Sequence, residues 1–303
     1  MRIVVTGREG QVVRSLVERG PALGHEVVPV GRPELDLAGD PSSLIEGIRL
    51  LSPDVVVSAA AYTAVDKAES EPDLAFAINE RGAAAVARAA ASVGAPLIHL
   101  STDYVFDGNK LDPYIETDPT GPTGIYGASK LAGETAVIDS YSNTAILRTA
   151  WVFSPFGTNF VKTMLRIASD RDAIPVVADQ LGNPTSAHDI ADGVLRVARN
   201  LVSSKDEGLR GIFHMTASGD ATWADFAEAI FAASRKSGGA SAEVRRISTA
   251  DYPTPAKRPA NSRLNSSKLH DGHGVRLPDW RNALNEVVTR LSVETLQEEV
   301  SQR

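Results

Sequence analysis

The chain has 303 residues, enough for one large domain or two of ordinary size. Its hydrophobic content of 43% and charged content of 23% are typical of globular proteins that bury a sizeable core. The formal net charge of −7 argues against a nucleic-acid partner, whose phosphates need a concentrated basic surface. The lack of cysteine excludes disulfides, thiolate catalysis and thiolate metal sites.

The opening residues MRIVVTG carry one arginine and an apolar run that is too short for a signal peptide. No stretch approaches the roughly 18 to 20 consecutive apolar residues that cross a bilayer. We therefore expect a soluble protein of the cytoplasm that has no membrane partner, and the lack of cysteine fits a reducing compartment.

Short β-branched runs alternate with helical stretches in the first half of the chain. Strands are predicted at Ile3–Val5, His25–Val30, Asp54–Ser58, Pro96–Ser101 and Thr144–Arg148. Helices are predicted at Gln11–Leu23, Pro41–Leu51, Pro72–Val93 and Gly124–Tyr141. Buried strands without polar alternation, separated by helices, indicate an α/β fold with a doubly wound parallel sheet of the Rossmann type.

The rhythm loosens after about Trp151. Helices are predicted at Asn159–Ser169, His188–Asn200, Thr222–Ser237 and Pro278–Glu299. The stretch Tyr252–Ser267 is rich in proline and polar residues, and long irregular loops of this kind are usually functional or disordered. We expect a dinucleotide-binding domain over residues 1–150 and a smaller substrate-binding α/β domain over 151–303, some of whose segments return to the first domain.

A glycine turn follows the first strand and opens the first helix. Gly7 and Gly10 fit a G-x-x-G-x-x-G variant in which Val13 replaces the third glycine. Such a turn lets the backbone approach a pyrophosphate, and the helix N-terminus at Gln11 and Val12 supplies N–H groups and a positive dipole. An ordinary turn remains the alternative interpretation, but the position at the first strand–helix junction favours a dinucleotide site.

The end of the second strand bears on the choice of cofactor. An acidic residue there takes the ribose hydroxyls of NAD, whereas this strand ends in Arg32, which can pair with a 2′-phosphate. The sequence therefore favours NADPH and leaves NADH open, since Arg32 can also be a solvated surface residue. Asp36, followed by Leu37, either faces the adenine or caps a turn.

Tyr126 and Lys130 lie four residues apart on one face of a predicted helix. A nearby cation stabilises a phenolate and brings the tyrosine closer to a working acid. Thr102 and Asp103 end the fourth strand, where the carboxyl edge of a doubly wound sheet meets its ligand. A Y-x-x-x-K pair alone means little, but the three elements in this order on this fold are specific.

With these motifs the chain resembles the extended short-chain dehydrogenases/reductases, and within them those that reduce 4-keto sugar nucleotides. The matching stretches run from Ala59, Ala60 and Ala61 to Glu69, Ser101 to Gly108, Tyr126 to Glu134, Arg148 to Val152, Asp179 to Thr185 and Arg258 to Leu264. They span nearly the whole chain.

The resemblance implies that NAD(P)H donates hydride to the C4 carbonyl of dTDP-4-dehydro-L-rhamnose, giving dTDP-L-rhamnose. It assigns the proton to Tyr126, the nicotinamide ribose and a lowered Tyr126 pKa to Lys130, and carbonyl orientation to Thr102. It implies further cofactor contacts at Ala59, Ala60 and Ala61. Substrate contacts are expected at Asp103, Tyr104, Val105, Trp151, Gln180 and Arg258. Among these, Tyr104 and Trp151 shape the sugar pocket, and Gln180 and Arg258 face the nucleotide.

Three alternatives bear on this assignment. The related 4,6-dehydratases carry Asp-Glu after the threonine, whereas Tyr104 follows Asp103 here, which disfavours dehydration. An epimerase on another 4-keto 6-deoxy sugar nucleotide shares the tyrosine and lysine and stays open. A non-catalytic regulatory subunit of the same fold is suggested by Val13, although intact Thr102, Tyr126 and Lys130 argue against it.

We expect no metal site. His270 and His273 have a spacing that can grip a metal, but no further ligand pattern accompanies them. Some members of the resembled family are dimers bridged by a divalent ion through glutamates, and the corresponding positions here are Ser15 and His188. A homodimer remains the assembly expected from the frequency of two-fold symmetric enzymes.

Overall fold

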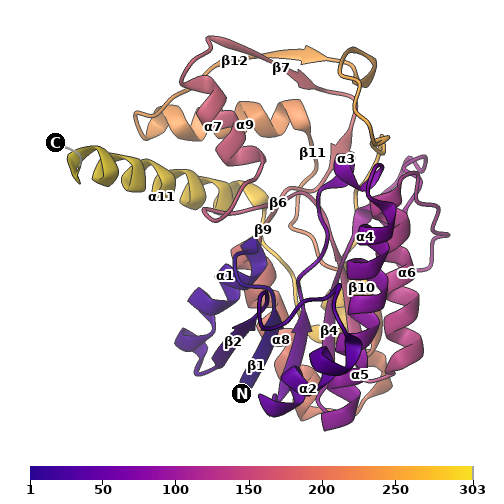
Figure 1. Ribbon diagram of the computed structural model, residues 1–303. Coiled ribbons are helices and arrows are strands. Elements are labelled where there is room, and N and C mark those ends of the chain that lie inside the picture. The colour runs from indigo at the N-terminus through magenta and orange to yellow at the C-terminus, as the bar shows by residue number, and fades with distance from the viewer. Residues whose placement is uncertain (302–303) are drawn as a thin grey trace.

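The computed structural model describes the backbone of residues 1–301 and the side chains of residues 1–294. A six-stranded sheet, whose pairs are all parallel, forms its centre (Figure 1). Its strands, in spatial order, are β10 (Gly211–His214), β5 (Thr144–Thr149), β4 (Leu97–Thr102), β3 (Val55–Ser58), β1 (Arg2–Thr6) and β2 (Glu26–Val30). The predicted doubly wound Rossmann sheet is confirmed, with β10 as an additional strand from the second half of the chain.

Helices cover both faces of this sheet (Figure 1). On one side lie α1 (Gln11–Arg19) and α8 (Ala187–Ser203), which pack against each other. On the other lie α2 (Pro41–Leu50), α4 (Pro72–Phe76), α5 (Ala83–Val93) and α6 (Ile125–Ser140). Because α8 and β10 belong to this layer, residues 187–214 return to the sheet after the chain has entered its second half.

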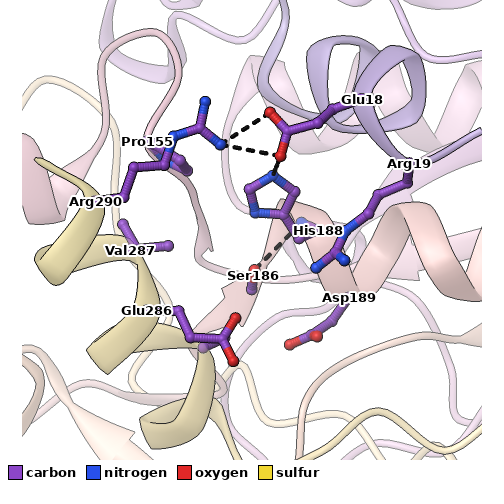
Figure 2. A pocket seen from close by; sticks show the side chains of 10 residues that line it. Glu18, Arg19, Pro155, Ser186, His188, Asp189, Glu286, Val287 and Arg290 are labelled. Atoms are coloured by element: carbon purple, nitrogen blue, oxygen red, sulfur yellow. Dashed lines mark hydrogen bonds and ion pairs between the residues drawn. The ribbon is translucent and has the colours of Figure 1, made fainter. Parts of the chain in front are cut away.

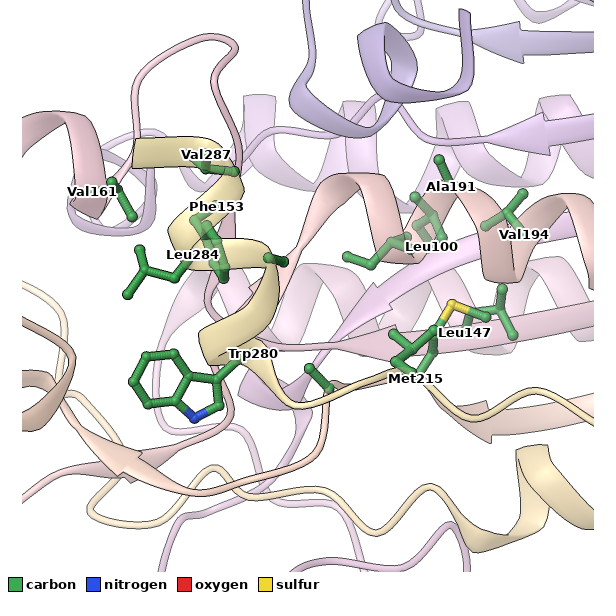
Figure 3. Close-up of a cluster of buried hydrophobic side chains, with 14 of the residues drawn as sticks. Leu100, Leu147, Phe153, Val161, Ala191, Val194, Met215, Trp280, Leu284 and Val287 are labelled. Carbon is green, nitrogen blue, oxygen red and sulfur yellow. The ribbon is translucent and has the colours of Figure 1, made fainter. Parts of the chain in front are cut away.

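Alternate residues of the strands feed two separate cores. Val55 and Val57 face the α1 and α8 side, whereas Val56 between them joins the core under α2 and α5. The same alternation holds for Ala145, Ile146 and Leu147 of β5, as expected for strands buried on both faces. Figure 3 shows how the first core continues from the sheet into the second half of the chain, where Trp280 and Leu284 lie.

The rest of the second half forms a lobe above the carboxyl edge of the sheet (Figure 1). It contains α7 (Phe160–Ala168), α9 (Trp223–Lys236) and α11 (Trp280–Ser301). Small two-stranded sheets complete it: β7 (Ala173–Val177) with β12 (Glu243–Ile247), β8 (Leu181–Gly182) with β11 (Ala221–Thr222), and β6 (Val152–Phe153) with β9 (Thr185–Ser186). Four of these six strands have only two residues and give almost no signal in the sequence, and none of the six was predicted.

Short segments connect these elements. They are the helices α3 (Val65–Ala68) and α10 (Ser267–His273) and the 3₁₀ turns η1 (Pro21–Leu23), η3 (Asp103–Val105), η4 (Glu207–Leu209) and η5 (Thr249–Asp251). Residues 252–266 contain no helix and only isolated bridges, in agreement with the irregular stretch that the sequence predicts. Within the described residues, no helix is both long and apolar enough to span a bilayer.

Two predicted helices are wrong in extent. Helix α1 stops at Arg19, because Gly20 and Pro21 follow and the chain turns into η1. The predicted helix over 72–93 is interrupted by a π-helical turn, η2 (Ala77–Gly82), between α4 and α5. Asn79 in this turn is buried, and its amide bonds both backbone groups of Tyr62, so the widened turn orders a loop after β3.

Candidate active site

The register of β4 and β5 fixes the centre of the site. Thr102 is the last residue of β4 and lies opposite Thr149, the last residue of β5, at the carboxyl edge of the sheet. Helix α6 begins nearby, and Glu69 caps it by accepting a hydrogen bond from the backbone N–H of Ile125 at 2.8 Å. A ligand at this edge therefore meets residues from two strand ends and the first turn of α6.

Tyr126 is brought to Thr102 by an unusually close approach of α6 to η3. A Cβ added to Gly127 would lie 2.2 Å from the carbonyl oxygen of Tyr104, so only glycine fits beside this turn. The rings of Tyr104 and Tyr126 meet edge to face with centroids 5.5 Å apart. Burial raises the pKa of Tyr126, the Thr102 hydroxyl opposes the rise, and the charge of Asp103 adds to it.

Lys130 follows one turn later on α6 and is buried. Its ammonium donates a hydrogen bond to the carbonyl of Leu100 at 2.7 Å, and burial lowers its pKa to about 8. Lys130 was expected to lower the pKa of Tyr126. In the structure its ammonium is held by β4 instead, and the pKa of Tyr126 is raised. The spacing of four residues was informative about the helix face but not about the partner of the ammonium.

Asp103 is almost completely buried and faces Thr102. The Thr102 hydroxyl donates to its Oδ1 at 2.8 Å and accepts from the Tyr104 N–H at 3.2 Å. Burial raises the pKa of Asp103 to about 6, although the hydrogen bond from Thr102 opposes the rise. The carboxylate thus governs the direction in which the Thr102 hydroxyl points.

Arg258 reaches the site from the irregular stretch of the second half. Its guanidinium donates to the hydroxyl of Tyr104 at 3.3 Å and to Asp66 of α3 at 2.7 Å. Burial raises the pKa of Tyr104 to about 12, so its hydroxyl stays protonated beside the cation. The structure brings the predicted pair Tyr104 and Arg258 together, and it adds Asp66, which the sequence analysis missed although it lies in one of the matching stretches.

The glycine turn has the geometry that a pyrophosphate needs. Gly7 has φ +100°, which favours glycine, and its N–H bonds the carbonyl of Val30 at 2.6 Å. Gly10 precedes the nine-residue helix α1 in an extended conformation, and the N–H groups of the first helical turn, at Gln11 and Val12, have no acceptor within the helix. Val13 is buried, with Cγ2 3.3 Å from a Cβ built on Gly7, so it fills the core behind the turn.

Thr6 joins this turn to the end of β3. Its hydroxyl accepts hydrogen bonds from the N–H groups of Ala59 and Ala60, both at 3.0 Å. Ala60 also lies 3.4 Å from a Cβ built on Gly7, so Ala59, Ala60 and Ala61 follow a strand end beside the glycine turn. Thr6 was not predicted, and only its place before the first glycine could have indicated it.

The remaining predicted cofactor residues differ in exposure. Arg32 is exposed after β2 and pairs with no carboxylate among the described residues. Asp36 is exposed and accepts from the Ala38 N–H, which closes a turn, whereas Leu37 is buried. The Gln11 side chain accepts from Ser154 Oγ at 2.8 Å and so ties α1 to the segment after β6.

Three predicted substrate residues lie in packed surroundings. The Val105 side chain is completely buried in a small cluster with Phe106 and leaves no surface for a ligand. Gln180 is 6% exposed, and both ends of its amide are bonded, to Trp223 Nε1 and to Thr249 Oγ1. Trp151 is partly exposed two residues beyond Thr149, with its ring stacked on Trp223.

A separate pocket, lined by none of these residues, lies between α1, α8 and α11 (Figure 2). In it Glu18 accepts hydrogen bonds from Arg290 at 2.9 Å and pairs with His188 at 3.1 Å. Ser15 is buried nearby on α1. Residues 1–294 hold no group of three or more histidines or carboxylates placed to share a metal ion, and both ring nitrogens of His273 have protein partners.

The Rossmann sheet, the glycine turn and the gathering of Thr102, Tyr126 and Lys130 define an extended short-chain dehydrogenase/reductase. The chain belongs to the family described as the RmlD substrate binding domain, whose model matches residues 1–293.

Individual relatives agree with this family. The chain is 52% identical over 295 residues to a dTDP-4-dehydrorhamnose reductase of Sinorhizobium fredii, across 97% of this chain and 99% of the relative. It is similar to the crystal structure of such a reductase from Clostridium acetobutylicum, with a TM-score of 0.87, 37% identity and coverage of 98% and 100%. A Bacillus anthracis reductase in complex with NADP gives a TM-score of 0.88, 34% identity and coverage of 95% and 99%.

Proposed function

We propose that this chain is an NADPH-dependent oxidoreductase that reduces the C4 ketone of dTDP-4-dehydro-L-rhamnose to dTDP-L-rhamnose. The observation that carries the proposal is the Tyr126 hydroxyl held beside Thr102 at the carboxyl edge, in a chain 52% identical to a dTDP-4-dehydrorhamnose reductase. The complex of a similar reductase with NADP supports the choice of NADPH over NADH.

The chain's own residues supply the proton and the orientation for this reduction. NADPH, when bound, supplies the hydride that the carbonyl carbon accepts. Tyr126 donates its phenolic proton to the carbonyl oxygen, so that one hydride and one proton turn the ketone into an alcohol. Thr102 orients the carbonyl, and Lys130 holds the nicotinamide ribose with an ammonium that β4 already fixes at Leu100.

The glycine turn and its neighbours fit the cofactor. The amides at Gln11 and Val12 face a phosphate in the way that helix N-termini do. Arg32, exposed and free of a carboxylate partner in the described part of the chain, takes the 2′-phosphate of NADPH. The loop at Ala59, Ala60 and Ala61 runs beside the turn, and Asp36 and Leu37 follow Arg32 on the adenine side.

The substrate is held between the sheet edge and the lobe. Asp103, Tyr104 and Trp151 surround the sugar, whereas Val105, which is completely buried, packs behind them with Phe106. Arg258 binds the diphosphate, because a guanidinium matches phosphate geometry, and Gln180 lies on the same side. We also assign residues 1–150 to the dinucleotide-binding domain and residues 151–303 mainly to the substrate-binding domain.

Location and assembly complete the proposal. We place the enzyme in the cytoplasm, a reducing compartment that suits a chain without cysteine, and expect a homodimer, since two-fold assemblies are the commonest. Light scattering on a sizing column would contradict the dimer by returning the mass of one chain, 32.1 kDa.

A panel of 4-keto sugar nucleotides, each assayed with NADPH and NADH, tests the activity. We expect the nicotinamide absorbance to fall fastest with dTDP-4-dehydro-L-rhamnose and NADPH, and dTDP-L-rhamnose to appear in equal amount. An epimerase would instead interconvert C4 epimers without net consumption of NADPH. A regulatory protein would leave every substrate unchanged, and either result would contradict the proposed reduction.

A further inference from the structure

Trp151 has a backbone conformation that needs support. Its φ is +47°, a left-handed value that it shares with one other non-glycine residue in the described chain, Ser52. Bulky side chains avoid this region at a cost of about 1–3 kcal/mol, and such residues persist only where their surroundings hold them. Trp151 lies just beyond Thr149, the last residue of β5 at the edge of the sheet.

The support comes from Trp223, the first residue of α9. The two indoles stack with centroids 3.6 Å apart and planes inclined by only 8°. Phe160 of α7 lies on the assembly as well, with its centroid 4.7 Å from that of Trp223. Both tryptophans remain partly exposed, so the stack is a wall at the surface rather than an element of the deep core.

The small sheet β8–β11 aligns the two rings. Gly182 of β8 pairs with Ala221 of β11, and Trp223 follows two residues later, after the helix cap Thr222. A Cβ on Gly182 would lie 2.3 Å from Cε2 of Trp151, so the indole lies directly against the backbone there. The same pair of strands thus positions both rings: β8 contacts the Trp151 indole through Gly182, and β11 leads directly into Trp223.

Gln180 fixes the rotation of Trp223 in its plane. The indole N–H of Trp223 donates to Oε1 of Gln180 at 3.2 Å, and Nε2 of Gln180 donates to the hydroxyl of Thr249 at 3.0 Å. Thr249 in turn donates to Asp179 at 2.6 Å. A chain of hydrogen bonds from Asp179 through Thr249 and Gln180 therefore ends on the Trp223 indole, which stacks on Trp151.

We propose that Trp223, oriented by Gln180, is a positioning residue that holds the Trp151 indole as a wall of the sugar pocket and so sets the affinity for the sugar nucleotide. This inference rests on the proposed function. It also gives Gln180 a role in orientation, because both ends of its amide are already bonded within the lobe. Groups that hold a binding residue in place control affinity without touching the ligand.

Steady-state kinetics of Trp223→Ala and Trp223→Phe test the proposal. Because Trp151 loses its stacking partner, we expect Trp223→Ala to raise KM for the sugar nucleotide about tenfold, the order of one aromatic pair. We expect kcat to change less than about twofold and NADPH affinity to stay unchanged. Trp223→Phe keeps a ring at this place and should restore most of the affinity. Gln180→Leu, which leaves both indoles in place, should raise KM by a smaller factor.

Circular dichroism adds a readout of the stack that is independent of turnover. The chain has three tryptophans, and two stacked indoles give a coupled signal that separate ones do not. Trp223→Phe and Trp151→Phe should each abolish this signal. Trp280→Phe is the matched control, since Trp280 also packs on Phe226 of α9 but outside the stack, and it should keep the signal and the KM.

The outcomes separate this inference from the proposed function. An active wild type whose KM is unchanged in Trp223→Ala would overturn the inference alone. A loss of NADPH affinity together with KM would also overturn it, because it would indicate a general structural role. A wild type that reduces none of the 4-keto sugar nucleotides would overturn both.

Discussion

Thr102, Tyr126 and Lys130 come from one strand end and one helix. Trp151, Trp223 and Arg258, which we propose as the facing wall of the substrate site, come from loops and a helix start in the second half. The first group is fixed by sheet register and by the closeness that Gly127 permits. The second is fixed by ring stacking and side-chain hydrogen bonds. We infer that substitutions in the first group affect the chemical step, and that those in the second affect substrate affinity.

The largest effect is expected at the sheet edge. Tyr126→Phe removes the proton donor but keeps the ring that meets Tyr104, so the fold and NADPH affinity should stay intact. Turnover should fall about 10³-fold, within the range of general acid catalysis. The measurement is the decrease of nicotinamide absorbance with saturating sugar nucleotide.

Tyr104→Phe is the matched control for that experiment. It removes the hydroxyl of Tyr104, which accepts a hydrogen bond from Arg258, whereas the hydroxyl of Tyr126 lies beside Thr102. KM should rise more than kcat falls. Equal losses of kcat in the two variants would erase the distinction between the two regions.

The next effect belongs to the facing wall. Arg258→Ala removes a guanidinium that is placed to bind the diphosphate, and KM for the sugar nucleotide should rise about 10- to 100-fold, as for other charge-assisted hydrogen bonds. Arg258→Lys should recover only part of the affinity, because an ammonium lacks the planar fork. Binding of the product dTDP-L-rhamnose, measured calorimetrically, checks the same affinity without turnover.

Asp66→Asn completes this set. It removes the charge that Arg258 contacts at 2.7 Å and leaves the guanidinium present. We expect a smaller change in KM than for Arg258→Ala. An Arg258→Ala enzyme with unchanged KM would take the arginine out of the substrate site.

The sequence predicts the sheet-edge group of the site better than the facing wall. The parallel sheet, the glycine turn and the helix face of Tyr126 and Lys130 follow from periodicity and spacing, which are local signals. The bond from Lys130 to Leu100 was missed, because it depends on how deeply α6 packs against β4.

The facing wall could be predicted only in part. Arg258 and Trp151 were identified through the resemblance, but their partners Asp66 and Trp223 were not. Asp66 lies 192 residues before Arg258, and Trp223 meets Trp151 through two-residue strands that leave no pattern. Contacts of this kind depend on the tertiary arrangement and not on any local preference.

A smaller effect should appear in the pH profile. Burial raises the pKa of Asp103 to about 6, so its ionised fraction grows as the pH rises through that value. The ionised carboxylate accepts the hydrogen bond of the Thr102 hydroxyl, which then cannot be donated to the ketone, and its charge raises the pKa of Tyr126. Both changes disfavour protonation of the ketone. We expect kcat/KM to fall about fivefold between roughly pH 5 and pH 7, the value of one hydrogen bond.

Asp103→Asn should flatten this step, because an amide does not titrate. Asp189→Asn is the control, since burial also raises the pKa of Asp189 to about 6 but its carboxyl lies in the pocket of Figure 2. The step should persist there. Its persistence in Asp103→Asn would show that another group controls the profile.

The smallest effect is expected at that second pocket, which neither region of the active site touches. Glu18→Gln weakens the contacts of Glu18 with Arg290 and His188. Because all three side chains are partly exposed to water, the free energy of unfolding should fall by about 1 kcal/mol or less. Turnover should not change.

Glu134→Gln makes the same substitution in the ion pair with Arg148, where both side chains are only 2% exposed. Because the guanidinium would be left buried without its counter-charge, that variant should lose about 3–5 kcal/mol in denaturant unfolding. Similar losses in the two variants would mean that the pocket between α1, α8 and α11 is as tightly closed as the core beneath the active site.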